Sequence, residues 1–518
     1  MDADNPGNST HLAGELPEDG LAAPQSPVSL ETFGGKIYID WDPGAAVTPL
    51  GQLPFFIAFL KTSGLYEPWV AECPLTYKSN NAPGKADVLG TLVLSVLSGH
   101  RRYSHITGLR GEGVNPELLG MKKVVSEDAA RRAFRWSDES AVASWQQRHL
   151  QHCLGPLLYE PWILDVDTTV KTLYGHQEGA EVGYNPAKPG RPSHTYHTYF
   201  VANLRLVLEV EVQAGNRTAA LYSRPGLWSL LDRVGRGAWP RFIRGDCAWG
   251  NECPMAECEE RGVDYLFKVR QTTGVRRLVA RLFSRRDWVD AGQGWEGVED
   301  TLKLSGWSRS RRVVVLRRRI REEIALAGED SASGQMRMAF LETAGSADPY
   351  EYAVLATSLV EPVLTVAQHY RDRADAENNF DEMKNHWGWC GYTTHDLNRC
   401  RIMARIVAQV YNWWSLFVRL SIPERHAEAL TSRPLLLHGV GKLSRHAGQS
   451  KLTITSLHGK RSGVQRILVS VGRLFQVLKS TAEQLTQAER WRWLLSIIFR
   501  RFLGGRLLQT PLMLEYSG

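Results

Sequence analysis

Apolar and polar positions follow two different spacings along the chain. A helical spacing of apolar residues predicts helices at 53–60 and 87–98. Another helix is predicted after Ser126, which has the character of an N-cap with two acids in the first turn behind it. From residue 162 onward the spacing becomes that of strands. The chain is therefore expected to begin with helices and to continue as an α/β domain.

The predicted strands alternate with helices in an order that suits one sheet. Buried or alternating runs predict strands at 162–170, 196–201, 204–212, 241–246, 264–270 and 352–359. Helices are expected at 225–234, through Met255 and Cys258, and at 401–420. A mixed sheet flanked by helices accounts for this order and can bring the ends of its first and fourth strands together.

Two of these strands carry carboxylates at unusual places. Asp165 and Asp167 are two residues apart on the first strand, so both side chains point to the same face. Asp246 ends the fourth strand. Carboxylates in a buried strand need a cation or a proton to offset their desolvation. We expect Asp167 and Asp246 to meet at one edge of the sheet.

A third carboxylate lies in a predicted helix over 370–384, which has no Gly, Pro or β-branched residue. At about 100° per residue, Tyr370, Arg373, Glu377 and Lys384 fall on one narrow stripe. Such a stripe predicts a helix face turned toward something polar and charged. An ordinary amphipathic helix would place apolar residues there.

The chemistry that these acids suit is metal-dependent phosphodiester transfer. Asp167, Asp246 and Glu377 are hard oxygen ligands without nearby histidine or cysteine, which favours Mg²⁺ or Mn²⁺ over zinc. Two such ions activate the attacking oxygen and stabilise the leaving one. Arg373 and Lys384 could hold phosphates, and Tyr370 could pack on a sugar or base. From the residues alone, isolated structural acids remain the alternative.

The charge of the chain favours a polyanionic partner. The net charge is +7 and the isoelectric point about 9. Arginine clusters interleaved with tryptophans at 271–350 predict a β-rich insertion whose basic face contacts phosphates and stacks on bases. A solvated surface is the alternative there. The basic turn at 100–113, between helices, suits a DNA-binding bundle or a plain helical domain.

The ends of the chain carry different signals. Residues 1–35 hold several acids and no Lys or Arg, which predicts a flexible acidic tail without a signal peptide. After Pro423 the chain is expected to be helical and basic. An apolar stripe there is interpreted as core in preference to a dimer or DNA contact: Val464, Leu468, Val471, Phe475 and Leu478. Seven cysteines in a long chain, and no apolar run that could span a bilayer, indicate a reducing cytosol without a membrane partner.

The spacing Tyr370-x2-Arg373-x3-Glu377-x6-Lys384 resembles in full the signature of a superfamily of bacterial insertion-sequence transposases. These are DDE enzymes with an RNase H-like fold. Residues 165–170, together with segments between 175 and 197, resemble the region around the first catalytic aspartate in one branch of this superfamily. Residues 244–246 and 263–265 resemble the region around the second catalytic aspartate of the same branch. Residues 247–250 read Cys-Ala-Trp-Gly where that branch usually has Ser-Gly-Phe. The resemblance covers about residues 85–420.

The resemblance implies an α/β fold, with an RNase H-like mixed five-stranded sheet flanked by helices and interrupted by a β-rich insertion. It implies that Asp167, Asp246 and Glu377 are catalytic and bind two Mg²⁺ or Mn²⁺ ions, and that Tyr370, Arg373 and Lys384 bind DNA. The expected divisions are a tail at 1–35, an N-terminal helical DNA-binding domain at 36–158, a catalytic core at 159–270 and 351–422, the insertion at 271–350, and a C-terminal helical basic region at 423–518.

The function that the resemblance implies is DNA transposition. The enzyme would bind the terminal inverted repeats of an insertion sequence, cleave the ends and join their 3′-hydroxyls to target DNA. It would work as a homodimer or larger synaptic complex, in the cytoplasm of a bacterium and associated with the nucleoid.

Three alternatives stay open. A transposase-derived protein could bind DNA without cleaving it. His458-Gly-Lys-Arg461 and Tyr516 could belong to a metal-independent tyrosine recombinase. Cys247, Cys253 and Cys258 could bind zinc, although their spacing fits no standard knuckle.

Overall fold

The computed structural model divides the chain into two units, 1–46 and 47–518. It describes residues 27–42, 44–79, 81–320, 350–389, 391–455, 461–480 and 485–508. In the first unit, β1 (Val28–Thr32) and β2 (Gly35–Ile39) form an antiparallel hairpin. The expected tail at 1–35 therefore extends too far, because main-chain pairing begins at Val28; residues 1–26 lie outside the described part.

The second unit begins with the short strand β3 (Val47–Thr48) and a group of helices. These are α1 (Leu53–Ser63), α2 (Tyr66–Ala71), α3 (Lys85–Leu97), α4 (Asn115–Leu118), α5 (Glu127–Arg132) and α6 (Glu139–Leu154). Ser126 caps α5 as predicted, since its side chain accepts a hydrogen bond from the Ala129 amide. The basic run at 100–113 contains a 3₁₀ helix, Tyr103–Leu109.

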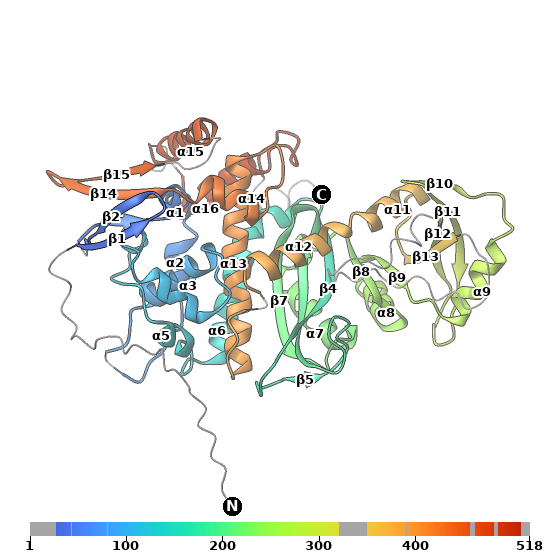
Figure 1. Cartoon of the computed structure of the whole chain (residues 1–518). Coiled ribbons are helices and arrows are strands. Elements are labelled where there is room, and N and C mark those ends of the chain that lie inside the picture. The colour runs from blue at the N-terminus through green and yellow to red at the C-terminus, as the bar shows by residue number, and fades with distance from the viewer. Residues whose placement is uncertain are drawn as a thin grey trace, which may run out of the picture. The chain divides into compact units, whose positions relative to one another are not determined.

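A ten-stranded mixed sheet forms the centre of this unit (Figure 1). Its strands are β4 (Ile163–Thr172), β5 (Glu181–Val182), β6 (Pro192–Val201), β7 (Leu206–Ala214), β8 (Phe242–Gly250), β9 (Asp264–Val269), β10 (Val289–Gly292), β11 (Trp295–Leu302), β12 (Arg311–Arg319) and β13 (Tyr350–Thr357). Strands β4, β8 and β9 run parallel, whereas β6 pairs antiparallel with both β4 and β7. The first and fourth predicted strands are therefore neighbours.

The expected five-stranded sheet proves to be part of a larger one. β13 pairs antiparallel with β9, and β12, β11 and β10 continue outward from it. The described part of the insertion also contains a helix, α9 (Thr273–Leu282). A separate hydrophobic cluster joins core and insertion through Phe242, Val314, Leu355, Val363 and their neighbours. The insertion extends the sheet because it satisfies the main-chain groups of what would otherwise be an open edge.

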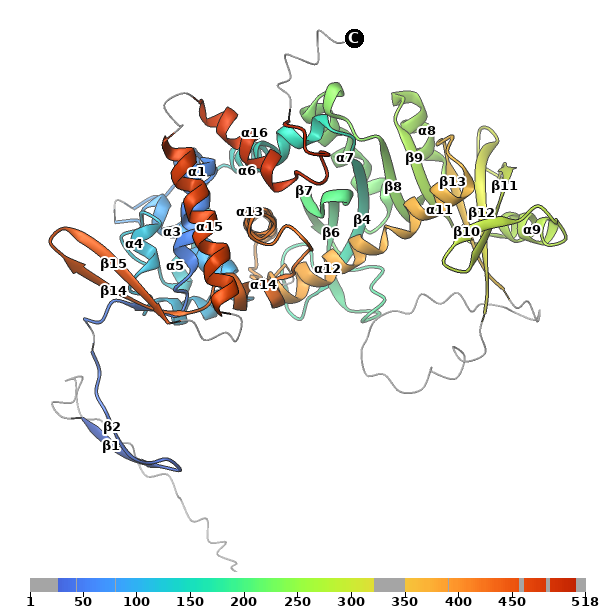
Figure 2. The same ribbon diagram turned by 90° about the horizontal axis from the view of Figure 1, so that it is seen from above.

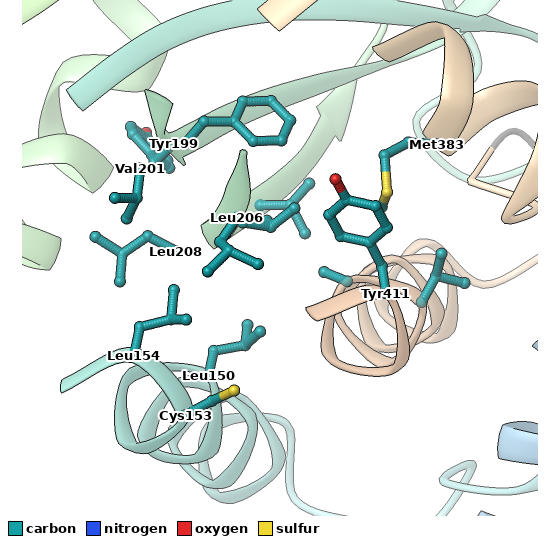
Figure 3. Close-up of a cluster of buried hydrophobic side chains, with 14 of the residues drawn as sticks. Leu150, Cys153, Leu154, Tyr199, Val201, Leu206, Leu208, Met383 and Tyr411 are labelled. Carbon is teal, nitrogen blue, oxygen red and sulfur yellow. The ribbon is translucent and has the colours of Figure 1, made fainter. Parts of the chain in front are cut away.

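Helices cover both faces of the sheet (Figure 2). α7 (Ala220–Val234) and α8 (Glu252–Arg261) lie on one side, and α11 (Val363–Arg371) and α12 (Ala374–His386) on the other. Pro225 lies inside α7, not near its start as expected. Figure 3 shows leucines of α6 and β7 packed together, with Tyr411 of α13 (Leu397–Ser421) beside them. Each such buried leucine stabilises the fold by roughly 1.5–3 kcal/mol.

A buried ionic cluster links β7 to α13 and α7. The Arg405 Nε donates to Glu209 Oε1 at 2.8 Å, and Arg233 Nη2 lies 3.5 Å from Glu209 Oε2. Glu211 lies next to them, against α7 at Gly226, where a Cβ would come within 1.8 Å of its carboxylate. Burial raises the pKa of Glu211 to about 7, and Glu209 adds to the effect.

This shift predicts a pH-dependent stability. The folded state holds a proton on Glu211 between its unfolded pKa of about 4.5 and its folded pKa of about 7, so the associated stability is lost as the pH rises through this window. Glu211→Gln should raise the Tm by a few degrees at pH 8 and change it little at pH 5. Thermal melts at both pH values test this. Glu181 is exposed and provides the control, so Glu181→Gln should leave the difference in Tm between pH 5 and pH 8 as it is in wild type. If Glu211→Gln shows the same difference in Tm as wild type, the raised pKa does not belong to Glu211.

The C-terminal part is not wholly helical as expected. After α14 (Ala429–Leu436), β14 (Val440–His446) and β15 (Gln449–Thr455) form an antiparallel ribbon that also pairs with β3. α15 (Arg461–Ser480) and α16 (Gln487–Ile498) follow. The predicted apolar stripe of α15 is buried, which confirms its interpretation as core. Within the described ranges, the chain has no helix with the length and apolar character needed to traverse a bilayer.

Candidate active site

Asp167 and Asp246 come together on neighbouring strands. In the parallel pairing of β4 with β8, Asp165 lies opposite Arg244 and Val166 opposite Gly245, so the two aspartates follow directly on each strand. The Thr168 amide donates to Asp167 Oδ1 at 2.7 Å, and the Ala248 amide donates to Asp246 Oδ1 at 2.9 Å. Both carboxylates are partly exposed. The sequence-based expectation that these two strands would meet here agrees with this geometry.

Asp165, the other acid of β4, is paired with an arginine. Its carboxylate accepts two hydrogen bonds from Arg244, at 2.5 Å from Nε and 2.7 Å from Nη2. Both side chains are about 98–99% buried. The third nitrogen of Arg244 donates to the carbonyl oxygen of His369, near the end of α11. One guanidinium thus joins β8, β4 and α11.

The predicted continuous helix at 370–384 is instead two helices. α11 ends at Arg371 and α12 begins at Ala374, with a tight turn between them in which the Arg373 amide bonds to the Tyr370 carbonyl. Tyr370 therefore belongs to α11, Arg373 is the N-cap residue of α12, and Glu377 and Lys384 lie within α12. The prediction of one continuous helix was wrong here, because residues 370–384 are helix formers and nothing among them signals a turn.

Arg373 connects the first and third candidate acids. Its Nη2 contacts Asp167 Oδ2, and its Nη1 lies 3.3 Å from Glu377 Oε1. The Glu377 side chain is 56% exposed. The oxygens of Asp167, Asp246 and Glu377 do not all lie within 4.8 Å of one another, since the guanidinium lies between two of them. Lys384 is two turns further along α12 and makes no ion pair with a described acid.

Arg373 offsets the burial of Asp167 only in part. Burial raises the pKa of Asp167 to about 6, Arg373 opposes this shift, and Asp246 adds to it. Burial lowers the pKa of Arg373, but Asp167 and Tyr370 outweigh that effect and raise it above its ordinary value. Burial also raises the pKa of the Tyr370 phenol. The site can accommodate more positive charge than Arg373 supplies.

Two features of this region were not found from the sequence. Lys268 on β9 lies close enough to Asp246, Cys247 and Arg373 to interact with all three. The sequence signal that could have identified Lys268 is a lysine between two buried residues of a strand. Glu382, His426 and Glu428 form a set whose ligand atoms lie within 4.8 Å of one another among the described residues. Glu382 already accepts hydrogen bonds from Trp387 and from the Ala429 amide at the start of α14, which is a capping arrangement.

The open alternatives fare differently. Cys253 is exposed and Cys258 is buried, and with Cys247 they form no metal-binding group in the described part of the chain, so the zinc interpretation is wrong. His458, Lys460 and Tyr516 lie outside the described residues, and the side chain of Arg461 does as well. The recombinase interpretation is therefore untested by the structure.

The arginines of the insertion are mostly paired with acids. In the described range 271–320, seven of eleven arginines form ion pairs: Arg281, Arg285, Arg309, Arg311, Arg312, Arg317 and Arg318. The tryptophans also contact arginines, as Arg317 lies 3.9 Å from the centre of the Trp288 ring. These seven arginines are therefore paired with acids of neighbouring strands, of α8 or of nearby loops, and their predicted contact with phosphates and bases stays a prediction.

Most of the chain matches one known protein family. Residues 78–476 match the family described as Transposase DDE domain group 1, and this range includes all six predicted site residues. The chain therefore belongs to this family of DDE transposases. Members generally depend on divalent metal ions.

A comparison with solved structures gives only a distant similarity. A solved structure titled "Cryo-EM structure of piggyBac transposase synaptic complex with hairpin DNA (SNHP)" is similar at 13% identity and a TM-score of 0.38. The match covers 86% of this chain and 84% of that one. Among curated proteins, none matches this chain.

Proposed function

We propose that the chain is an active DNA transposase of a bacterial insertion sequence. It binds the terminal inverted repeats of its own element, cleaves the ends and joins their 3′-hydroxyls to target DNA. The observation that carries this proposal is that Asp167 and Asp246 lie on adjacent parallel strands in a chain of the DDE family. The Arg373 guanidinium contacts both Asp167 and Glu377, and so links the third acid to the first.

The order of the core strands supports an RNase H-like fold. Among the strands described, β7, β6, β4, β8 and β9 lie side by side in that sequence. Of these five strands only β6 runs in the opposite direction, and the two aspartates lie on the adjacent parallel strands β4 and β8. The resemblance implies a mixed five-stranded sheet flanked by helices, and this arrangement supports that proposal. The proposed catalytic core comprises 159–270 and 351–422, with a DNA-binding helical domain at 36–158 before it.

The residues present fit a divalent metal. Asp167, Asp246 and Glu377 supply hard carboxylate oxygens, the donors that Mg²⁺ and Mn²⁺ prefer. The raised pKa of Asp167, caused by burial and by Asp246, indicates that additional positive charge would be favourable there. When bound, two such ions would polarise the scissile phosphate and activate the attacking oxygen. We propose that Asp167 and Asp246 hold both ions and that Glu377 completes one site.

The other side chains hold the DNA end in place. Arg373 contacts Asp167 and Glu377, and we propose that its guanidinium also binds a terminal phosphate there. Tyr370 lies beside it on the preceding turn and is proposed to pack on a sugar or base. Lys384 is proposed to contact a phosphate further along the strand. Two DNA ends must be joined, so a homodimer or larger synaptic complex is the proposed working form.

The proposal is tested with DNA that carries the ends of the element encoding this chain. Purified protein should nick this DNA in Mg²⁺ or Mn²⁺ and should not do so in EDTA. Scrambled end sequences provide the control. DNA cleavage in EDTA that leaves protein covalently attached would support the tyrosine recombinase instead. Specific binding without cleavage in any divalent metal would support a DNA-binding protein that has lost catalysis.

A further inference from the structure

The positive charge of the chain is concentrated in one segment. Residues 429–482 contain no Asp or Glu over 54 residues, the longest such run in the sequence. They contain nine Lys or Arg and so carry a charge of +9, which leaves the rest of the chain at −2 against the total of +7. This segment comprises α14, β14, β15 and α15. The charge of this segment, +9, is thus larger than the net charge of the whole protein, +7.

The ribbon β14–β15 presents a polar face to solvent. Side chains alternate along it, so Lys442, Ser444 and His446 share one face with their partners Thr453, Lys451 and Gln449. All six are exposed. The other face is partly buried through Leu443, Leu452 and Ile454. The ribbon projects beyond the helices at its base in both views (Figures 1 and 2).

The base of the ribbon is held firmly. The Gly51 amide donates to the Gly439 carbonyl at 2.6 Å, and Gln52 Nε2 donates to the carbonyls of Leu435 and His438 at 2.9 and 2.7 Å. A Cβ at Gly51 would come within 2.6 Å of the Gly439 oxygen, so only glycine permits this approach. The ribbon is therefore a fixed projection, not a loose loop.

α15 adds a second basic surface. Its apolar stripe is buried, with Phe475 packed 6.5 Å from Phe59 between ring centres. Its outer face holds a shallow depression lined by Ser462, Gln465, Arg466, Val469, Ser470 and Arg473. Arg466 and Arg473 are seven residues apart and so lie on one side of the helix. In both views, α15 and the ribbon lie on the same side of α13, away from the insertion.

The exposed cations of this segment are mostly without acidic partners. Of Lys442, Arg445, Lys451, Arg466, Arg473 and Lys479, only Arg445 forms an ion pair with a described acid, Glu117. The arginine-rich insertion shows the opposite, since most of its described arginines are paired. Cations that are already paired lose those contacts when they bind a phosphate, whereas unpaired cations do not.

We propose that the outer face of β14–β15 and the outer face of α15, here called the C-terminal basic surface, bind the phosphate backbone of duplex DNA. This assignment rests on the proposed function as a DNA-processing enzyme, and it places the principal non-specific DNA contact away from the arginine-rich insertion. A two-stranded ribbon fits a DNA groove and a basic helix face fits the adjacent backbone. A lysine on an edge strand also deters aggregation, but that role does not explain the absence of acids from two successive elements.

The test compares two variants of equal charge in the full-length protein. The surface variant is Lys442→Gln, Lys451→Gln, Arg466→Gln and Arg473→Gln; the control is Arg281→Gln, Arg285→Gln, Arg309→Gln and Arg318→Gln, whose side chains are 38–63% exposed and paired with acids. Affinity for a random-sequence duplex is measured by fluorescence anisotropy over a range of salt concentrations. Each lost phosphate contact reduces the slope of log K against log salt by about 0.9, so the surface variant should lose roughly three to four units and the control less than one.

Each outcome decides the assignment. An unchanged slope in the surface variant, a larger loss in the control, or no binding of DNA by wild type would overturn the proposed surface. If the surface variant loses binding to anionic phosphatidylserine vesicles but still binds DNA like wild type, the C-terminal basic surface binds membranes and the DNA assignment is overturned. Cleavage of end DNA by wild type is measured on the same preparations. If wild type does not cleave while the surface variant loses its salt dependence, the catalytic proposal fails and the surface stands.

Discussion

Replacing Glu377 by glutamine is expected to slow end cleavage by roughly a thousand-fold, because the proposed metal site loses one of its charged ligands. This corresponds to about 4 kcal/mol of transition-state stabilisation, within the range that bound metal ions supply. The Glu377 side chain is 56% exposed and contacts Arg373 alone among described acids and bases, so the fold should be unaffected. Single-turnover cleavage in Mg²⁺ and the Tm, measured together, test both statements.

A control for Glu377 lies on the same helix. Asp381 is an exposed acid of α12, one turn further on, with a hydrogen bond from Asn385. Asp381→Asn should cleave at the wild-type rate. Equal cleavage by Glu377→Gln and wild type would remove Glu377 from the proposed site, whatever the result for the two aspartates.

Replacing Arg244 alone by methionine should destabilise the protein by about 3–5 kcal/mol, because Asp165 would remain buried without its partner. Replacing both, as Arg244→Met with Asp165→Leu, should restore the Tm nearly to the wild-type value, since a buried ion pair rarely stabilises more than apolar residues of similar size. Cleavage by this double variant should still be about a hundred-fold slower. The reason is that Arg244 links the two strands that carry the aspartates to the helix before Arg373 and Glu377, and small displacements of reacting groups are costly.

A second buried pair offers the matched control. Arg405 and Glu209 are similarly buried on α13 and β7, without contact to the acids of the site. The double variant Arg405→Met with Glu209→Leu also removes the contact of Glu209 with Arg233, and it should cleave at the wild-type rate. Wild-type cleavage by the Arg244 and Asp165 double variant would show that the pair serves folding alone. Affinity for Mn²⁺, followed by electron paramagnetic resonance, should fall in that variant and not in the control.

The local elements of the core could be predicted because each has a strong internal pattern. Strands β4, β7, β8 and β9 and helix α13 lie close to the predicted ranges. The pairing of β4 with β8 followed from strand order and the connection between them. The family of the chain followed from the spacing of residues 370–384, which the match over 78–476 supports at the level of the family.

Other features depend on contacts between distant residues. Nothing local indicates that Glu296 and Glu299 lie beside the arginines of β12, so that segment seemed more basic than its surface is. The partner of Asp165 is 79 positions away. The turn at 372–373 interrupts a run of helix formers, and its position is set by the packing of α11 on the insertion strands. These ion pairs and this turn depend on which distant segments pack together, and local residue patterns do not show that.

The continuous ten-stranded sheet ties the insertion to the rest of the fold. Removing the insertion would expose β13 as an open edge and uncover the apolar side of α11, where Val363 and Val366 pack against insertion residues such as Ala291. Glu377 and Arg373 follow directly on that helix. The insertion thus packs against the helix that leads to two of the proposed site residues, and a shortened chain that lacks the insertion is expected to aggregate.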